Sequence, residues 1–149
     1  MQQEPISDIH NRLFFRLFQV GNSLQRQAIK ELGITTVQWA VLGALTRPKA
    51  AQGMSFGELA DYLLVSRQNL DSVLKRLERA GHVSRVPHDT DKRVRVVILL
   101  PAGQKFWEET LIRIHEFYAQ AMRNFRFDDS VTFVHYLNHL LHDLEEVKL

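Results

Sequence analysis

The stretch Ser66-Arg-Gln-Asn-Leu-Asp-Ser-Val-Leu-Lys-Arg-Leu-Glu-Arg-Ala-Gly81 decides the fold of this 149-residue chain. Ser66 is a favourable helix N-cap and Gly81 a favourable left-handed C-cap, so the stretch predicts one helix. Its apolar residues form a narrow stripe that we expect to be buried: Leu70, Val73, Leu74, Leu77 and Ala80. The opposite face is predicted to be exposed and polar, and it carries Gln68, Asp71, Ser72, Lys75 and Arg79.

A second short helix precedes this one. The sequence Ser55-Phe-Gly-Glu58 has the pattern of a capping box, in which a hydroxyl and a carboxylate satisfy backbone donors at a helix start. We expect that helix to reach about Leu64. Two short helices capped at Ser55 and Ser66 have the proportions of a helix-turn-helix.

The pattern changes after Gly81. Residues His82–His88 and Val94–Leu100 are β-branched and apolar, and each run is too short for a helix. Between them lies the polar turn Asp89-Thr-Asp-Lys-Arg93. The sequence therefore predicts a two-stranded hairpin with a charged tip, placed where a wing follows a helix-turn-helix.

Longer helices are predicted on both sides of this core, over Ile6–Lys30, Thr36–Thr46, Pro101–Arg126 and a last helix opened by Asp128 and Asp129. The predicted fold class is mainly α with a small β-hairpin wing. We expect a single domain over 1–149, with a winged helix-turn-helix core at 36–100 and dimerisation helices at 1–32 and 101–149. These flanking helices carry more apolar surface than a small winged domain needs.

Composition narrows the function classes. The chain has no cysteine, which excludes disulfides, thiolate metal sites and thiol redox switching. No nucleophile with a paired base and no Gly-rich phosphate loop is present, so an enzyme is not expected, and neither is a cofactor. The longest uncharged stretch has 15 residues, too short to cross a bilayer, and no basic region precedes an apolar run. We expect a cytoplasmic protein without a membrane partner.

The charge is unevenly distributed. Ser66–Arg95 holds eight basic and four acidic residues, a net +4, whereas the remaining 11 basic and 13 acidic residues give −2. Such a positive segment is typical of a surface that binds a phosphate backbone, although a solvated helix face would also be charged. The residues that we expect to contact DNA are Ser66, Arg67, Gln68, Asn69, Ser72, Lys75, Arg76, Arg79, Lys92, Arg93 and Arg95.

These residues suit two grooves. Polar side chains in the first turns of a helix can bond base edges in a major groove about 12 Å wide, and the later cations suit phosphates. Arg93 at the hairpin tip is the candidate for the minor groove, where negative potential is concentrated. Asp91 and Arg85 are expected to support the wing.

The run from Leu59 to Gly103 resembles the DNA-binding core of the multiple-antibiotic-resistance regulator (MarR) family. The residues that carry the resemblance are Leu59, Ala60, Ser66 to Leu70, Leu74, Leu77, Glu78, Gly81, Arg85, Asp91, Lys92, Arg93, Leu99 and Gly103. One departure is Leu100, where the family usually has a helix-capping Thr. The resemblance implies an obligate homodimer with two winged lobes that binds a palindromic operator in double-stranded DNA.

The resemblance also implies a ligand-responsive regulator, expected to be a repressor that a small-molecule effector releases from its operator. The expected effector is an aromatic acid, a phenol or a coenzyme A (CoA) thioester. An aromatic slot with a cation would suit it, and the candidate residues are Phe14, Arg16, Phe18, Trp39, Gly43, Phe106 and Arg113. The alternative is that these aromatic residues simply belong to the core.

Two other functions stay open from the sequence. His135, His139 and His142 lie at i, i+4 and i+7, a spacing that allows a shared metal ion and hence a metal-sensing regulator. The alternative is a solvated or subunit-facing cluster. A winged-helix protein-interaction module is the third possibility, which the exposed +4 segment disfavours.

Overall fold

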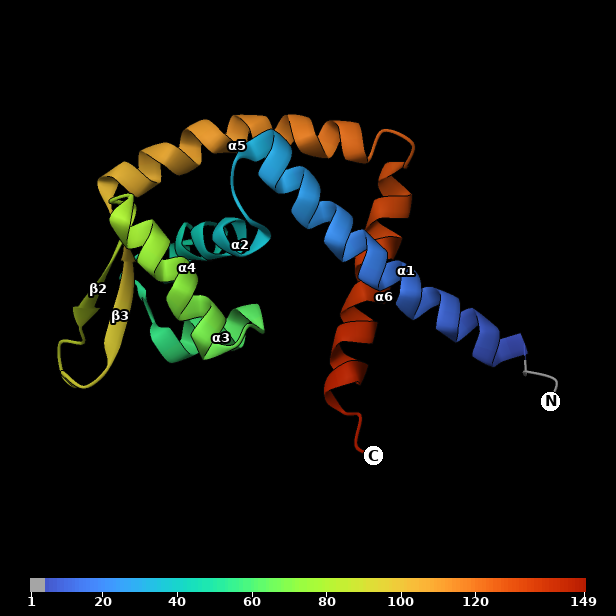
Figure 1. Ribbon diagram of the computed structural model, residues 1–149, viewed down its shortest axis with the longest axis horizontal. Coiled ribbons are helices and arrows are strands. Elements are labelled where there is room, and N and C mark those ends of the chain that lie inside the picture. The colour runs from blue at the N-terminus through green and yellow to red at the C-terminus, as the bar shows by residue number, and fades with distance from the viewer. Residues whose placement is uncertain (1–4) are drawn as a thin grey trace. The chain divides into compact units, whose positions relative to one another are not determined.

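The computed structural model describes residues 5–149 (Figure 1). Its elements are α1 (Pro5–Gln27), a π-helical turn (Ala28–Leu32), α2 (Thr36–Leu45), a 3-10 turn (Pro48–Ala50), β1 (Met54–Ser55), α3 (Phe56–Leu63), α4 (Arg67–Arg79), β2 (Val83–Pro87), β3 (Arg95–Leu99), α5 (Pro101–Ala121) and α6 (Phe127–Glu145). The chain divides into two compact units, of which the first ends at Leu111 and the second spans Ile112–Leu149.

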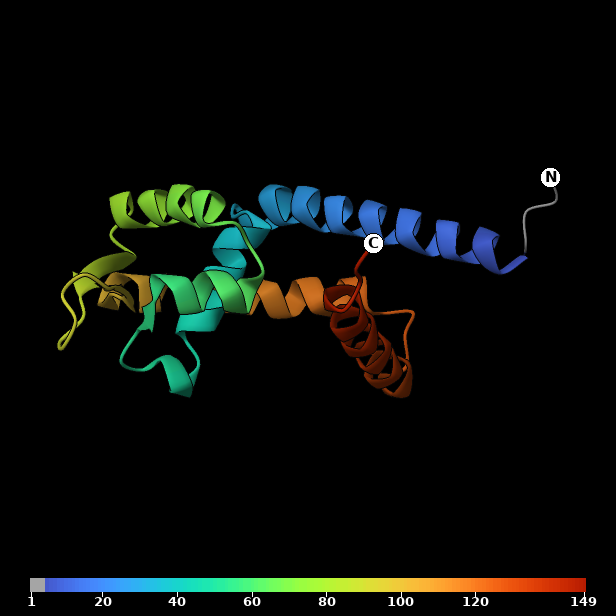
Figure 2. The same cartoon turned by 90° about the horizontal axis from the view of Figure 1, so that it is seen from below.

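The first unit contains the winged helix-turn-helix, which confirms the predicted fold class. The hairpin of β2 and β3 is antiparallel, with Val83 opposite Leu99 and Pro87 opposite Arg95. It projects at one end of the unit, past α3 and α4 (Figure 2). A third strand was not predicted: β1 pairs with β3 and makes the sheet order β1-β3-β2. With only two residues, β1 is too short to leave a periodic signal in the sequence.

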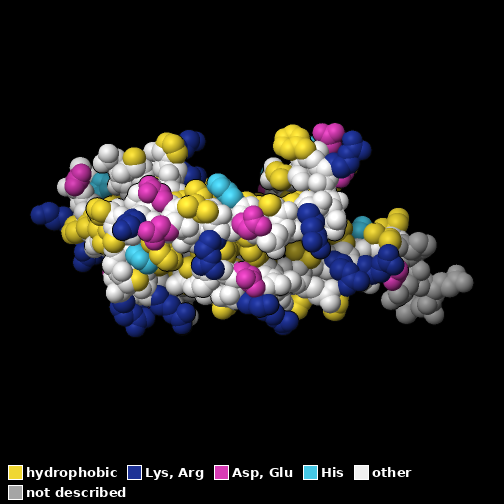
Figure 3. All heavy atoms as spheres, turned by 90° about the horizontal axis from the view of Figure 1, so that it is seen from above, with side chains coloured by type: hydrophobic (Ala, Val, Ile, Leu, Met, Phe, Trp, Pro, Cys, Tyr) yellow, Lys and Arg dark blue, Asp and Glu magenta, His cyan; other side chains and the backbone are white. Residues whose placement is uncertain are grey.

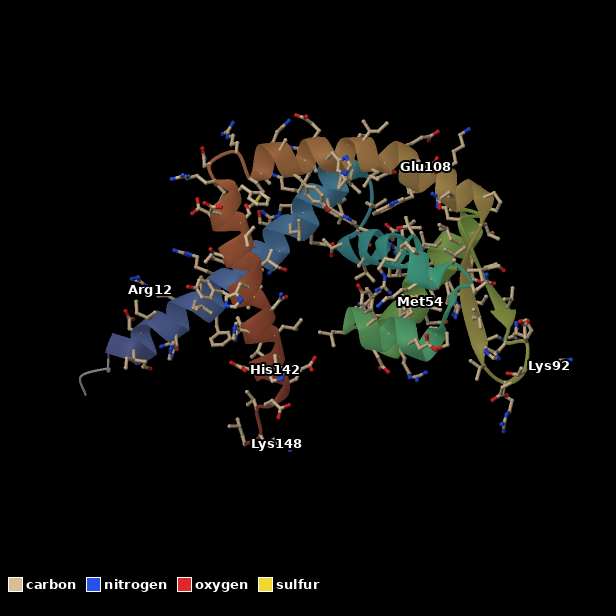
Figure 4. The ribbon with its side chains drawn as sticks, turned by 180° about the vertical axis from the view of Figure 1, so that it is seen from behind. Arg12, Met54, Lys92, Glu108, His142 and Lys148 are labelled. Carbon is tan, nitrogen blue, oxygen red and sulfur yellow. The ribbon has the colours of Figure 1, made fainter. Side chains whose placement is uncertain are left out.

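The core of this unit forms where α4 packs against α2, α3 and the sheet. Leu70, Leu74 and Leu77 turn inward from α4 and are at most 2% exposed. Met54 of β1 lies on the inner side of α2 and α3 (Figure 4). Ala80 was expected to extend the buried stripe but is exposed, because it is the C-cap residue at which α4 ends.

Local hydrogen bonds fix the turn between α3 and α4. Ser66 Oγ accepts from the backbone N–H of Asn69 at 3.1 Å, as expected of an N-cap. Ser55 Oγ accepts from the N–H of Glu58, also at 3.1 Å. Leu64 has a positive φ of 57°, a left-handed conformation that closes α3 in a tight turn. These bonds set the two helices at the short spacing of a helix-turn-helix.

α1 ends earlier than predicted, whereas α2 begins at Thr36 as predicted. α1 stops at Gln27 and continues as the π-helical turn, where one helix to Lys30 was predicted. A full capping box, which was not predicted, opens α2 between Thr35 and Gln38. Among residues 5–149, no helix is both long and apolar enough to span a membrane.

The end of α5 is also earlier than predicted. The helix ends at Ala121, whereas the sequence predicted a helix to Arg126. The carboxylate of Asp129 accepts from the backbone N–H of Arg126 at 2.9 Å, so Arg126 caps α6. The cap therefore separates α5 from α6 by a short turn.

The contact between α5 and the hairpin gives the first prediction. A Cβ on Gly103 would lie 2.1 Å from the carbonyl oxygen of His82 and 2.8 Å from a methyl group of Leu99. We expect Gly103→Ala to lower the free energy of unfolding by about 1–3 kcal/mol, because backbone must shift to admit the methyl group. Urea titration followed by circular dichroism measures this change.

Gly21→Ala is the matched control. Gly21 lies in α1, and apart from its two chain neighbours and the backbone of its own helix no described heavy atom lies within 4 Å of the added Cβ. Alanine there should raise the free energy of unfolding by up to about 1 kcal/mol, through helix propensity. Equal effects of the two substitutions would contradict the close packing of α5 on the hairpin.

Candidate nucleic-acid interface

The polar face of α4 is exposed along its whole length, while its apolar stripe is buried. Its exposed polar side chains, from the N-cap to the last turn, are Ser66, Arg67, Gln68, Asn69, Ser72, Lys75, Arg76 and Arg79. Figure 3 shows Lys and Arg side chains spread over the face that it draws, among acidic and hydrophobic side chains. The arrangement provides amide, hydroxyl and guanidinium groups that can bond base edges and phosphates.

An open cleft of about 720 Å³ lies where the starts of α3 and α4 meet the wing. Four guanidinium groups line it, from both the helix and the hairpin. The lining residues are Ser55, Phe56, Gly57, Arg67, Gln68, Asp71, Arg85, Arg93, Val94 and Arg95. The cleft therefore joins the polar face of α4 to the wing in one cationic surface, which we call the α4–wing cleft.

Arg85 links the wing to α4. From β2, its Nη1 donates to Oδ1 of Asp71 at 2.6 Å and its Nε donates to Oε1 of Glu78 at 2.8 Å. Only 19% of the Arg85 side chain is exposed, and its guanidinium lies 5.9 Å from the centre of the Phe56 ring. Two carboxylates spaced seven residues apart on α4 thus hold one planar cation in a defined orientation.

The same contacts affect ionisation. Hydrogen bonds from Arg85 and then from Lys75 lower the pKa of Asp71 below its ordinary value of 3.8. Burial opposes the charged form of Arg85, yet the hydrogen bonds to Asp71 and Glu78 raise the pKa of Arg85 above its ordinary value. Asp71 and Arg85 therefore both carry their charges at neutral pH.

The tip of the wing has its own ion pair. Oδ1 of Asp91 accepts from the backbone N–H of Arg93 at 3.1 Å and from its Nε at 3.2 Å. The Arg93 side chain is nevertheless 91% exposed, so its remaining donors face outward. Lys92 lies beside it at the tip and points away from the unit (Figure 4). Asp91 thus orients Arg93 without covering it.

Sequence reasoning missed the partners of Arg85. Asp71 was assigned to the exposed face, and Glu78 was named only among the residues that carry the resemblance, whereas both bind the wing. The spacing of the two carboxylates was a usable signal, because residues seven apart on a helix lie on the same face. The register of β2, however, decides which strand residue meets them. Arg67 also differs from a free surface cation, since its guanidinium lies 5.6 Å from the centre of the Phe56 ring.

The predicted effector residues lie in different environments. Phe14 and Phe18 are exposed on α1, at 47% and 69%, and Arg16 donates to the side chain of Gln19 at 2.6 Å. Trp39 is half-buried on α2, and Arg113 is exposed in the second unit.

Phe106 packs against the core and stacks on His82, with ring centroids 4.4 Å apart. This packing favours the core alternative for Phe106. Trp107, which the sequence reasoning did not select, lies against Gly43: a Cβ there would be 3.5 Å from the indole ring. Both residues are visible in the sequence, but only the packing shows that the indole ring of Trp107 lies against Gly43.

The histidines of α6 do not come together as a metal site. The rings of His135 and His139 meet edge to face with centroids 4.6 Å apart, and His142 lies 3.3 Å from the carboxylate of Asp143. Within the described range 5–149, no three histidine or carboxylate groups are placed to hold a metal ion. The contacts of these rings thus give the metal-sensing alternative no support.

Comparison with known proteins agrees with this geometry. Residues 32–94 match the model of the MarR family. The chain is 43% identical over 144 residues to the transcriptional activatory protein BadR of Rhodopseudomonas palustris, covering 94% of this chain and 82% of the relative. It is 26% identical to the homoprotocatechuate degradative operon repressor of Escherichia coli, covering 89% and 90% of the two chains.

A solved structure of the reduced form of the protein AbfR bound to DNA has the same fold. It is 25% identical, with a TM-score of 0.79, and the match covers 96% of this chain and 99% of that one. The exposed helix face, the wing and these similarities have one explanation: the chain belongs to the MarR family of winged helix-turn-helix DNA-binding regulators and is not an enzyme.

Proposed function

We propose that this protein is a dimeric, ligand-responsive transcription regulator that binds a palindromic operator through α4 and the wing. The observation that carries the proposal is the α4–wing cleft, where Arg85 fixes the hairpin to the exposed polar face of the helix. A helix of this kind fits the major groove, and a rigid hairpin beside it reaches the neighbouring minor groove. Gln68 is the candidate for reading bases, and Arg93 for entering the minor groove.

Exposed apolar side chains support the dimer. On α1 they are Ile6, Ile9, Leu13, Phe14, Phe15, Leu17, Phe18, Val20 and Leu24, and on α6 they are Phe127, Val131, Phe133, Val134, Tyr136, Leu137, Leu141 and Leu144. A monomer in water would leave these helix faces as an aggregation hazard, and a second copy removes them from solvent. A two-fold dimer would present its two reading helices about 34 Å apart, one turn of the duplex.

The effector we propose is a small aromatic acid, a phenol or a CoA thioester. Support comes from the homoprotocatechuate operon repressor, whose name places it in the degradation of an aromatic compound. In this chain, aromatic and cationic side chains on α1 and α2 remain the candidates, among them Phe14, Arg16, Phe18 and Trp39. A ligand that releases DNA must bind the DNA-free form more tightly, by linkage.

We propose repression as the direction of control. One relative is named a repressor and another an activatory protein, so the same scaffold serves both directions among its relatives. Transcription from a promoter that overlaps the selected operator separates the two: added protein should lower the transcript level, and an increase would reverse this part of the proposal.

Two substitutions test the DNA-binding surface. We expect Arg93→Ala to weaken binding to every duplex by about tenfold and to reduce the salt dependence by about one unit of slope, because it loses a minor-groove or phosphate contact. Gln68→Ala should instead change the preferred sequence, at a cost of about 1–3 kcal/mol at one base position. Selection from a random duplex pool, followed by fluorescence anisotropy, measures both.

Lys49→Ala is the control for these variants. Lys49 is exposed but lies in the 3-10 turn after α2, outside the α4–wing cleft. It should bind the selected operator as tightly as the wild type does. If Arg93→Ala and Gln68→Ala bind DNA with the same affinity and sequence preference as Lys49→Ala, the assigned surface is wrong. That result would favour the protein-interaction module.

A thermal-shift screen tests the effector. Aromatic acids, phenols and their CoA thioesters should include a compound that raises the Tm of the free protein and displaces labelled operator at the same concentrations. Aliphatic acids of equal charge serve as controls. Compounds that raise the Tm without displacing DNA would show that binding and release are not coupled.

A further inference from the structure

A carboxylate lies on the face of α4 that the proposed function turns toward DNA. Asp71 is in the second turn of the helix and lines the α4–wing cleft together with Gln68 and Arg93. Its side chain is 38% exposed, so its charge acts on the cleft. A duplex carries one negative charge on every phosphate, and a carboxylate in the contact surface opposes the binding of any sequence. Its position therefore needs an explanation other than affinity.

Both oxygens of this carboxylate are engaged by cations. Oδ1 accepts from Nη1 of Arg85 at 2.6 Å, and Oδ2 lies 3.0 Å from Nζ of Lys75. Arg85 also pairs with Glu78, so one of its two ion pairs to α4 does not involve Asp71. Asp71 therefore places a negative charge in the cleft in addition to holding Arg85.

We infer that Asp71 is a specificity-determining residue, which weakens the binding of phosphate in the α4–wing cleft and so lowers the affinity for unrelated sequences. The inference rests on the proposed DNA binding. Four guanidinium groups line the cleft: Arg67, Arg85, Arg93 and Arg95. Without the carboxylate, they would form a phosphate site open to any duplex. With it, the positive charge of the cleft is lower and the cations of Arg85 and Lys75 are engaged, so a phosphate binds there less strongly.

Asp71→Asn tests the inference, because it removes the charge and keeps the shape. Fluorescence anisotropy over a range of salt concentrations compares the operator selected by the wild type with an unrelated duplex. We expect the variant to bind the unrelated duplex about three- to tenfold more tightly, with a salt slope steeper by about one. Binding to the operator should not tighten, so the ratio of the two affinities should fall by at least the same factor.

Asp89→Asn is the matched control. It removes the same charge from an exposed position at the hairpin turn, outside the residues that line the cleft. It should change the affinity for both duplexes by the same factor and leave the ratio of the two affinities unchanged. Asp71→Ser is a second neutral variant, and it should lower the ratio as Asp71→Asn does. Thermal unfolding of each variant verifies that the fold is retained.

Two results would overturn the inference alone. If both Asp71 variants bind the two duplexes more weakly by the same factor, this carboxylate only supports the scaffold. If the ratio of the two affinities does not change, it is an ordinary surface charge. A wild-type protein that binds no duplex, or shows no difference between the two, overturns the proposed function as well. That outcome is visible in the wild-type measurements and does not depend on the variants.

Discussion

The hydrogen-bonded ion pairs of Arg85 with Asp71 and Glu78 are the interaction on which the rest of the site depends. A two-stranded hairpin is only marginally stable by itself, and pairing with the two residues of β1 adds little. Arg85 connects β2 to two carboxylates that lie about two turns apart on α4, and its side chain is largely shielded from water. Charge pairs of this kind contribute more to defined geometry than to net stability. The direction in which the wing projects from α4 follows from this pairing.

The interface separates two tasks that DNA recognition requires. Exposed cations on the wing, such as Arg93, can neutralise phosphates and supply affinity for any sequence. Amide and hydroxyl groups at the start of α4 can select bases. Asp71 lines the cleft with residues of both sets, and its negative charge opposes the first task. Specificity is a difference between affinities, and a repulsive group raises it by weakening the wrong complexes.

The sequence predicted most of the winged core because its signals are local. Ser66 and Gly81 mark the ends of one helix, the spacing of Leu70, Leu74 and Leu77 gives its buried face, and two short β-branched runs give the hairpin. The helix ends outside the core were less accurate, since they depend on hydrogen bonds that form only in the fold. One such bond lies between α5 and α6, where the carboxylate of Asp129 accepts from the backbone N–H of Arg126.

The site itself was only partly predictable. The exposed cations of α4 follow from its helical period, but the partners of Arg85 depend on which face of β2 meets the helix. Residue type also failed to separate core from pocket, because Phe106 and Trp107 carry the same apolar character as a ligand-binding aromatic. Only packing shows that Phe106 stacks on His82 and that Trp107 covers Gly43.

The central claim is that Arg85 sets the wing in the minor groove beside the helix. Chemical footprinting of the bound operator tests this claim most directly. Dimethyl sulfate reports guanine N7 in the major groove and adenine N3 in the minor groove. The wild type should protect guanine N7 at the centre of each half-site and adenine N3 at the flanks of each half-site. Arg85→Gln should keep the central protection and lose the flanking protection. A variant with the full wild-type pattern would contradict the account.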